Sequence, residues 1–159
     1  MSTSCPFTLH VFPNSPNGRK VLAVAHQLGL NPEIKIVDLL KREQKAPDFM
    51  SINPNGKNPA LTDGDLRLWE SNAICQYMSD KYGSSRLWGS DARARADVSR
   101  WMFWESTEWL PSVAPFVFEN MVKQFFMPGV PVTASAQVAG RTRLSTMVTE
   151  ILPNVLPPV

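Results

Sequence analysis

The sequence has 159 residues, of which 43% are hydrophobic and 19% are charged, and its formal net charge is +2. A charge this small, spread over scattered Lys and Arg residues, gives no reason to expect nucleic acid or an anionic membrane surface as a partner. No apolar stretch reaches the length of a membrane span, and the first dozen residues lack the pattern of a signal peptide. We therefore expect a cytoplasmic globular protein.

The four residues that could bind a metal or form a disulfide are Cys5, Cys75, His10 and His26. Their spacing is not that of zinc ligands, and two cysteines imply no disulfide framework, so we expect no metal. Cys75 falls on the inward side of an expected helix, where a packed small residue is the usual role. The two histidines have no partner in sequence and are expected in core or surface roles.

The first elements form a strand, a helix and a second strand. An apolar run predicts a strand over 8–12, a 3.6-residue period predicts a helix over 19–28, and alternation predicts a strand over 33–37. Ser15 is a good N-cap for this helix, and Pro16 suits its first position. Because strand, helix and strand follow within about thirty residues, the two strands should be parallel.

A hairpin and a helix follow. Residues 41–51 are polar and then weakly helical, and the segment 53–59, "NPNGKNP", is dense in turn residues. Two short apolar runs, 59–62 and 66–69, are split by "DGD", which is a hairpin signal. A helix is then predicted over 71–81, opened and capped by Ser71.

The composition changes after Gly83. Residues 84–90 are expected to form a linker between a first domain, 1–83, and a helical second domain, 91–159. In the second domain, Pro111 and Pro115 should bend or end the first helical segment.

A further helix is predicted over 117–126. After Pro128 the hydrophobic periodicity is weak, and it leaves the structure of residues 128–159 open within the partial helical domain.

Three stretches, "SPNGRKV", "NPNGKNPAL" and "ESNAI", together resemble the N-terminal domain of cytosolic glutathione transferases, in the serine-type nu, phi and theta classes. The resemblance covers about residues 7–83 and continues less sharply over 91–127. It implies an α+β thioredoxin-like domain (βαβ followed by ββα, with a mixed sheet), then a short all-α segment. Compared with that family, the helical second domain is incomplete, because nothing after Met127 matches it.

In the family, a residue in the turn before the first helix donates a hydrogen bond to the sulfur of glutathione, the co-substrate. Ser15 stands at that position, and Asn17 is the second donor, as in the nu class and a related fungal nitrogen regulator. Taken alone, the turn has a local explanation: Ser15 caps the helix and Asn17 fills the turn. The three stretches together favour the catalytic role. With no cysteine in the turn, the redox chemistry of Cys-Pro-x-Cys relatives is excluded.

The resemblance also implies how the tripeptide is held. Pro59 would follow a cis peptide bond, and the backbone of Asn58 would pair with the cysteinyl part of glutathione. The family usually has an aliphatic residue where Asn58 stands. Glu70 and Ser71, at the start of the third helix, would hold the γ-glutamyl group.

The glycyl carboxylate needs a polar or basic partner. Gln44 and Lys45 stand at about the family position, and Lys57 is another candidate. For any one of the three, solvated surface polarity is the more common explanation.

The resemblance implies a detoxification enzyme, a transferase of class 2.5.1.18 or a glutathione-dependent disulfide reductase. It would act on a small electrophile or a disulfide, as a homodimer. An aromatic and Met-rich segment, 101–127, is too apolar to be left exposed and also favours dimerisation. Two alternatives stay open: a non-catalytic module that binds glutathione or a partner chain, and a fragment that folds poorly.

Overall fold

The computed structural model describes residues 4–83 and 87–151. Within these ranges the chain forms two compact units, Met1–Val98 and Ser99–Val159. The boundary between the units falls inside helix α4, Ala92–Trp104. No helix in the described ranges combines the length and the apolar character needed to cross a bilayer.

The first unit is built on a four-stranded mixed sheet with strand order β2-β1-β3-β4. Its strands are β1 (Ser4–Val11), β2 (Asn31–Ile36), β3 (Ala60–Asp63) and β4 (Leu66–Trp69). β1 pairs with β2 in parallel, as the sequence predicted, and β3 is antiparallel to both β1 and β4. The predicted thioredoxin-like fold class is therefore confirmed.

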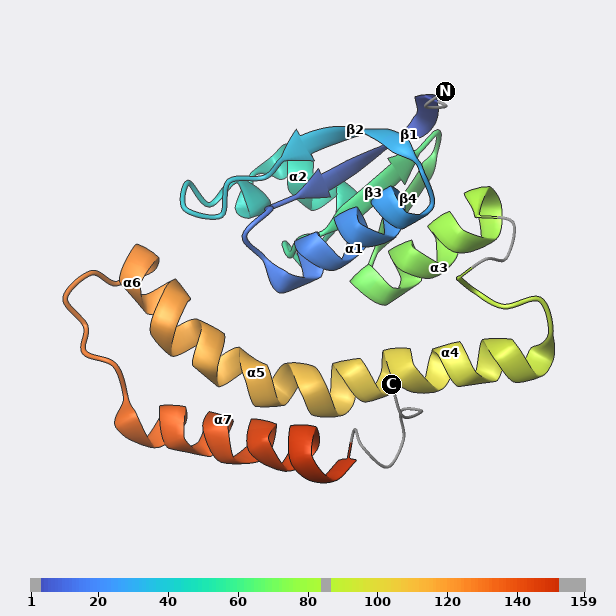
Figure 1. Cartoon of the computed structure of the whole chain (residues 1–159). Helices are drawn as coiled ribbons and strands as arrows, with labels where there is room; N and C mark the ends of the chain where they lie inside the picture. The colour runs from blue at the N-terminus through green and yellow to red at the C-terminus, as the bar shows by residue number, and fades with distance from the viewer. Residues whose placement is uncertain (1–3, 84–86, 152–159) are drawn as a thin grey trace. The chain divides into compact units, whose positions relative to one another are not determined.

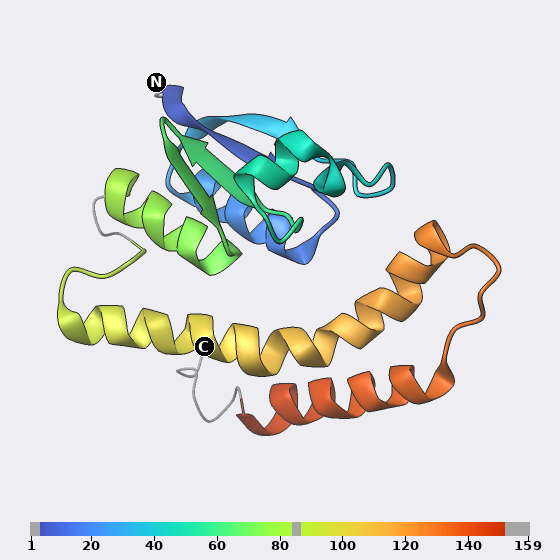
Figure 2. The same ribbon diagram turned by 180° about the vertical axis from the view of Figure 1, so that it is seen from behind.

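Helices cover both faces of this sheet. The helices α1 (Pro16–Gln27) and α3 (Ser71–Tyr82) lie side by side on one face. The short 3₁₀ turn η1 (Glu43–Lys45) and helix α2 (Pro47–Ile52) lie on the other, as Figures 1 and 2 show. Between the sheet and the α1–α3 layer, the alternating side chains of β1 are almost fully buried: Phe7, Leu9 and Val11.

Helix α1 begins three residues earlier than its periodicity predicts, because Ser15 caps it and Pro16 occupies its first turn. Helix α3 carries Ile74 and Met78 inward as predicted, and both are fully buried. Cys75 is 3% exposed, which fits the packing role expected for it.

The second unit consists of helices. From α4 the chain continues as helix through the π-helical turn η2 (Glu105–Trp109), α5 (Leu110–Val117), the π-helical turn η3 (Phe118–Val122) and α6 (Lys123–Phe126). The prolines at 111 and 115 were predicted to bend or end the helix, and neither ends it. Proline has no backbone N–H, so each of these prolines removes one helical hydrogen bond. A π-helical turn, which is wider than an α-helical one, lies on each side of α5 and accommodates this loss.

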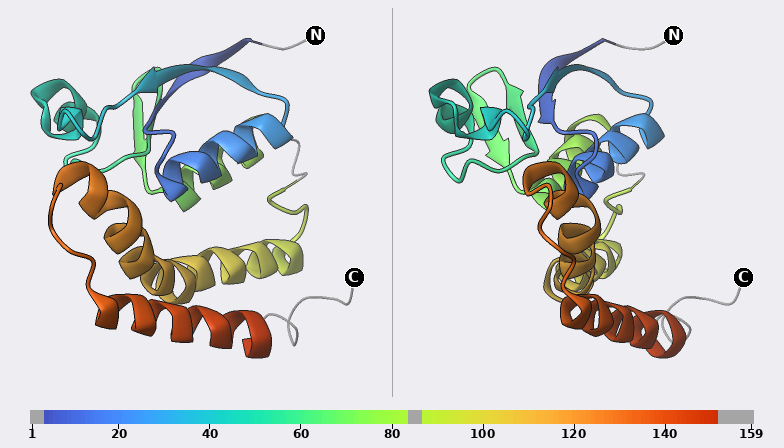
Figure 3. Two further views of the ribbon diagram at one scale, coloured as in Figure 1. Left: turned by 60° about the vertical axis from the view of Figure 1, so that its left-hand side comes forward. Right: turned by 90° about the vertical axis from the view of Figure 1, so that its left-hand side faces the viewer.

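The sequence left the structure after Pro128 open. Helix α7 (Ala134–Thr146) forms there, followed by the π-helical turn η4 (Met147–Ile151). α7 packs along α5, as Figure 3 shows. At this contact Gly140 is buried, and a Cβ added to it would lie in ordinary contact with the Ser112 carbonyl, at 3.5 Å. Tertiary packing therefore stabilises a helix whose own periodicity is weak.

Candidate functional site

The turn between β1 and α1 is closed by Ser15. Its backbone N–H donates to the Phe12 carbonyl at 2.9 Å, and its own carbonyl accepts the N–H of Arg19 at 2.9 Å. Its Oγ accepts the N–H of Gly18 at 3.4 Å. A hydroxyl that accepts one hydrogen bond can still donate another, so capping leaves the Ser15 proton available to a ligand. Asn17 is half-buried in the first turn of the same helix.

The loop before β3 contains a cis peptide bond between Asn58 and Pro59, as the sequence predicted. Pro59 is buried, whereas Asn58 is half-buried. The Asn58 side chain reaches back to the end of β1, where its Oδ1 accepts the N–H of Phe12 at 3.2 Å. The cis-proline loop and the Ser15 turn therefore meet at the Phe12 peptide unit.

The start of α3 differs in one detail from expectation. Glu70, not Ser71, holds the N-cap position, since the Glu70 carbonyl accepts the N–H of Ile74. Ser71 is the first helical residue and is buried. Glu70 has φ 69° and ψ 114°, a rare conformation for a residue with a side chain. Such backbone conformations cluster at ligand sites, which is consistent with a role for this helix end in binding.

Helices α1 and α3 are joined near their N-termini. Lys20 Nζ donates to Asn72 Oδ1 at 2.7 Å. Together with the bond between Asn58 and Phe12, this contact brings the Ser15 turn, the cis-proline loop and the start of α3 into one region of the first unit. These are the three stretches that the sequence selected.

The residues predicted to bind the glycyl carboxylate lie on η1 and on the loop that follows α2. Lys45 Nζ donates to the Asn55 carbonyl at 3.3 Å, and Lys57 is exposed two residues further along the loop. The Oε1 atom of Gln44 is buried and has no hydrogen-bond partner in the described part of the chain. A buried acceptor without a partner is uncommon in folded proteins, so this oxygen is a candidate to accept a hydrogen bond from a ligand.

Sequence reasoning missed the residue that shapes this loop. Asn53 is buried, and its side chain donates to the Lys57 carbonyl and accepts the backbone N–H of Asn55 at 3.0 Å. The "NPNG" pattern carried the signal, because an asparagine often organises a turn through its own side chain.

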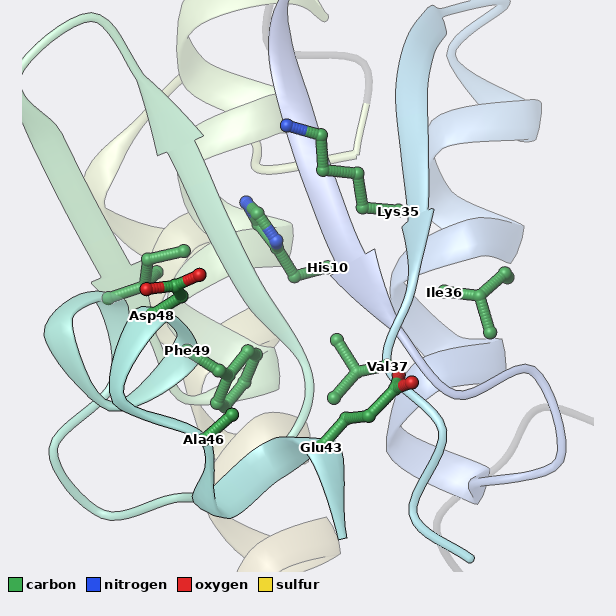
Figure 4. Close-up of a pocket in the computed structure, with 9 residues that line it drawn as sticks. His10, Lys35, Ile36, Val37, Glu43, Ala46, Asp48 and Phe49 are labelled. Atoms are coloured by element: carbon green, nitrogen blue, oxygen red, sulfur yellow. The ribbon is translucent and has the colours of Figure 1, made fainter. Parts of the chain in front are cut away.

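A hollow of about 360 Å³ lies elsewhere, on the α2 side of the sheet. Figure 4 shows most of its lining residues, which are His10, Lys35, Ile36, Val37, Glu43, Ala46, Asp48, Phe49 and Ile52. None of the predicted site residues is among them.

His10 lines this hollow and is buried, which fits the core role expected for it. Its Nε2 lies 3.2 Å from Thr62 Oγ1, and its ring meets the Phe49 ring edge-on at 6.3 Å. Burial, followed by the charge of Lys35, holds the pKa of His10 below its ordinary value. The neutral ring therefore joins β1 to β3 and to α2.

Metal binding finds no support in the described residues, where no three His, Cys, Asp or Glu side chains gather into a possible ligand set. The class that the fold and the site define is a thioredoxin-like domain whose cis-proline loop meets the N-terminus of α1.

Comparison with known proteins gives the family. The family described as "Glutathione S-transferase, N-terminal domain" matches residues 5–80. The glutathione transferase URE2P8 from Phanerochaete chrysosporium, solved with oxidized glutathione, superimposes with a TM-score of 0.81 at 32% identity, over 98% of this chain and 69% of that one. The chain belongs to the glutathione transferase family, as its three motifs indicated.

Two curated relatives show the range of the family. A probable glutathione S-transferase GSTF2 of Oryza sativa subsp. japonica is 36% identical over 126 residues, which is 79% of this chain and 59% of the relative. The transcriptional regulator URE2 of Saccharomyces cerevisiae is 33% identical over 114 residues, 67% of this chain and 32% of the regulator. The chain thus spans about three fifths or less of these relatives.

Proposed function

We propose that this protein binds glutathione and stabilises its thiolate for attack on an electrophile or a mixed disulfide. The observation that carries the proposal is the meeting of the Ser15 turn, the cis Asn58–Pro59 bond and the start of α3, joined through Phe12 and the Lys20–Asn72 contact. The relatives named as glutathione transferases, and the neighbour solved with oxidized glutathione, support the ligand.

Ser15 and Asn17 are proposed as the groups that stabilise the sulfur. A free thiol has a pKa near 8.5, so little thiolate exists at neutral pH. A hydroxyl donor and the positive end of α1 both favour the charged form. One hydrogen bond to a charged group contributes about 1.5 to 3 kcal/mol, which corresponds to about one to two pKa units of the thiol.

The remainder of the tripeptide is assigned to the neighbouring elements. The backbone of Asn58 beside Pro59 pairs with the cysteinyl group, and Glu70 and Ser71 hold the γ-glutamyl end. Lys45 and Lys57 on the adjoining loop, and the amide N–H groups of Gln44, take the glycyl carboxylate, because a carboxylate needs hydrogen-bond donors.

A second candidate function is a non-catalytic module that binds glutathione or a partner chain. The similarity to a protein named as a transcriptional regulator favours it. Turnover by the purified chain separates the two. A chromogenic electrophile and a glutathione mixed disulfide should be consumed by an enzyme, and neither should be consumed by a binding module.

Homodimerisation, a cytoplasmic location and a detoxification role are part of the same proposal. The exposed aromatic residues of segment 101–127, such as Phe103 and Phe125, support an interface between copies. Sedimentation at micromolar concentration tests this expectation, and a single monomeric species would count against it.

The thiolate assignment is tested with Ser15→Ala and Asn17→Ala. The variant that removes the main donor should raise the pKa of the bound glutathione thiol by about one to two units, read from the ultraviolet absorbance of the thiolate. Glutathione affinity at low pH should change little, because the neutral thiol gains little from the donor. If both variants titrate like the wild type, neither residue activates sulfur and the binding module is the better description.

A further inference from the structure

The side chain of Asn58 makes a hydrogen bond that a backbone carbonyl makes in a regular sheet. β1 and β3 pair from Phe7 opposite Asp63 to His10 opposite Ala60. Continued by two residues, the same register sets Phe12 opposite Asn58. In a regular antiparallel pair a backbone carbonyl would accept the Phe12 N–H, and here the Asn58 side-chain oxygen accepts it at 3.2 Å instead.

The backbone of Phe12 links this bond to the Ser15 turn. Its carbonyl accepts the N–H of Ser15 at 2.9 Å. The first turn of α1 also touches this backbone at Gly18, where an added Cβ would lie 2.5 Å from the Phe12 oxygen and 3.5 Å from Asn58 Oδ1. Asn58, Phe12 and the start of α1 are therefore packed closely together.

We propose that Asn58 is a positioning residue whose side chain holds Phe12, and through it the turn that presents Ser15. The consequence for sulfur chemistry rests on the proposed function, whereas the positioning of the turn does not. The Asn58 side-chain oxygen takes the role of a backbone carbonyl between β1 and β3. The backbone of the cis-proline loop therefore remains available to the ligand.

An aliphatic residue at position 58 would remove this acceptor. The Phe12 N–H is half-buried, and a buried donor without a partner is costly. The Ser15–Phe12 bond would then attach the turn to a strand end that has lost one of its own hydrogen bonds, and the turn should open more often.

The test measures amide hydrogen exchange on the full chain by NMR, without glutathione. Asn58→Leu should speed exchange of the Phe12 and Ser15 amides at least about tenfold relative to a reference amide in the centre of the sheet, Leu61. Asn58→Asp keeps an oxygen acceptor of the same reach and should stay within about threefold of the wild type. If Asn58→Leu does not fold, Asn58→Ser, whose hydroxyl is too short to reach Phe12, should show the same local opening.

The matched control is Asn55→Leu, in the same loop, whose side chain bonds to Asn53 and not to β1. It should leave the Phe12 and Ser15 amides unchanged. Unchanged exchange in Asn58→Leu and Asn58→Ser, or equal acceleration in the control, would overturn the positioning role.

A second measurement follows the consequence for sulfur. In the glutathione complex, Asn58→Leu should raise the pKa of the bound thiol by about one unit while binding at low pH persists. If the turn opens and the thiol still titrates like wild type, the link from Asn58 to the thiolate is wrong. If the wild type itself binds no glutathione, the proposed function fails, and the exchange data alone decide whether Asn58 positions the turn.

Discussion

The two compact units differ in how they bury apolar side chains. Among the described residues, every fully buried apolar side chain except Met147 belongs to the first unit. In the second unit, Phe103, Phe125 and Val138 are 70%, 61% and 63% exposed. A sheet between helices buries alternate side chains of each strand, whereas paired helices bury only the stripe that faces the neighbour.

Both units also contain a buried polar side chain whose hydrogen bonds fix a neighbouring segment. In the first unit, Asn53 shapes the loop beside the candidate site. In the second, Glu119 is buried, and its Oε2 accepts from Lys123 at 2.8 Å and from the Thr133 N–H at 2.7 Å, which ties α7 to η3. In each unit, a buried polar side chain therefore fixes a loop or the start of a helix through bonds to backbone groups.

The largest expected effect on stability separates a buried phenylalanine of the first unit from an exposed one of the second. Phe7 is 1% exposed and its ring lies 5.1 Å from that of Tyr82, so Phe7→Ala should lower the free energy of unfolding by about 3 to 5 kcal/mol. Phe103→Ala, at an exposed position, should cost less than about 1 kcal/mol. Urea denaturation measures both. Equal losses would show that the contrast in burial does not control stability.

The next effect concerns a carboxylate of the first unit. Asp63 Oδ2 accepts hydrogen bonds from Lys81, Tyr82 and Tyr77 at 2.7, 2.6 and 2.7 Å. Lys81 contributes most, followed by Tyr82 and Tyr77, and together they lower the pKa of Asp63 from 3.8 to about 2. Because the folded pKa lies below the unfolded one, this stabilisation is present above about pH 4 and is lost as the pH falls through about 2.

Asp63→Asn should therefore lower the free energy of unfolding at pH 7 by about 1.5 to 3 kcal/mol, and the loss should shrink between pH 4 and 2. Denaturation curves across this pH range provide the measurement. Asp65→Asn, at an exposed position of the same hairpin, is the matched control and should change stability by less than about 0.5 kcal/mol. A loss in Asp63→Asn that stayed constant with pH would rule out the charged cluster as its cause.

The smallest effect compares two helical glycines. A Cβ on Gly18 would meet the Phe12 oxygen at 2.5 Å, whereas on Gly140 its nearest neighbour is the Ser112 carbonyl at 3.5 Å. Gly18→Ala should cost about 1 to 2 kcal/mol, because overpacking outweighs the helix propensity of alanine. Gly140→Ala should be neutral or stabilising by up to about 1 kcal/mol. Thermal unfolding resolves the sign, and stabilisation by Gly18→Ala would contradict the close approach of Phe12.

Much of the first unit could be predicted from the sequence, because its signals are local. Alternation marked β2, the "DGD" turn marked the hairpin, and Ser15 followed by Pro16 marked the start of α1. Each of these signals acts through backbone preferences and bonds within a few residues. The cis bond before Pro59 followed from the family resemblance, and the structure contains it.

The tertiary structure alone decided which distant groups became partners. Asn58 and Phe12 are 46 positions apart, and Lys20 and Asn72 are 52 apart. Helix α7 has weak periodicity of its own and forms where Gly140 meets α5. The sequence by itself determined the elements and the residue types at the site, because these depend on short-range backbone energetics. Only the fold determined that the Asn58 side chain would accept the Phe12 N–H next to the Ser15 turn, because that bond exists only once β1 and β3 are paired.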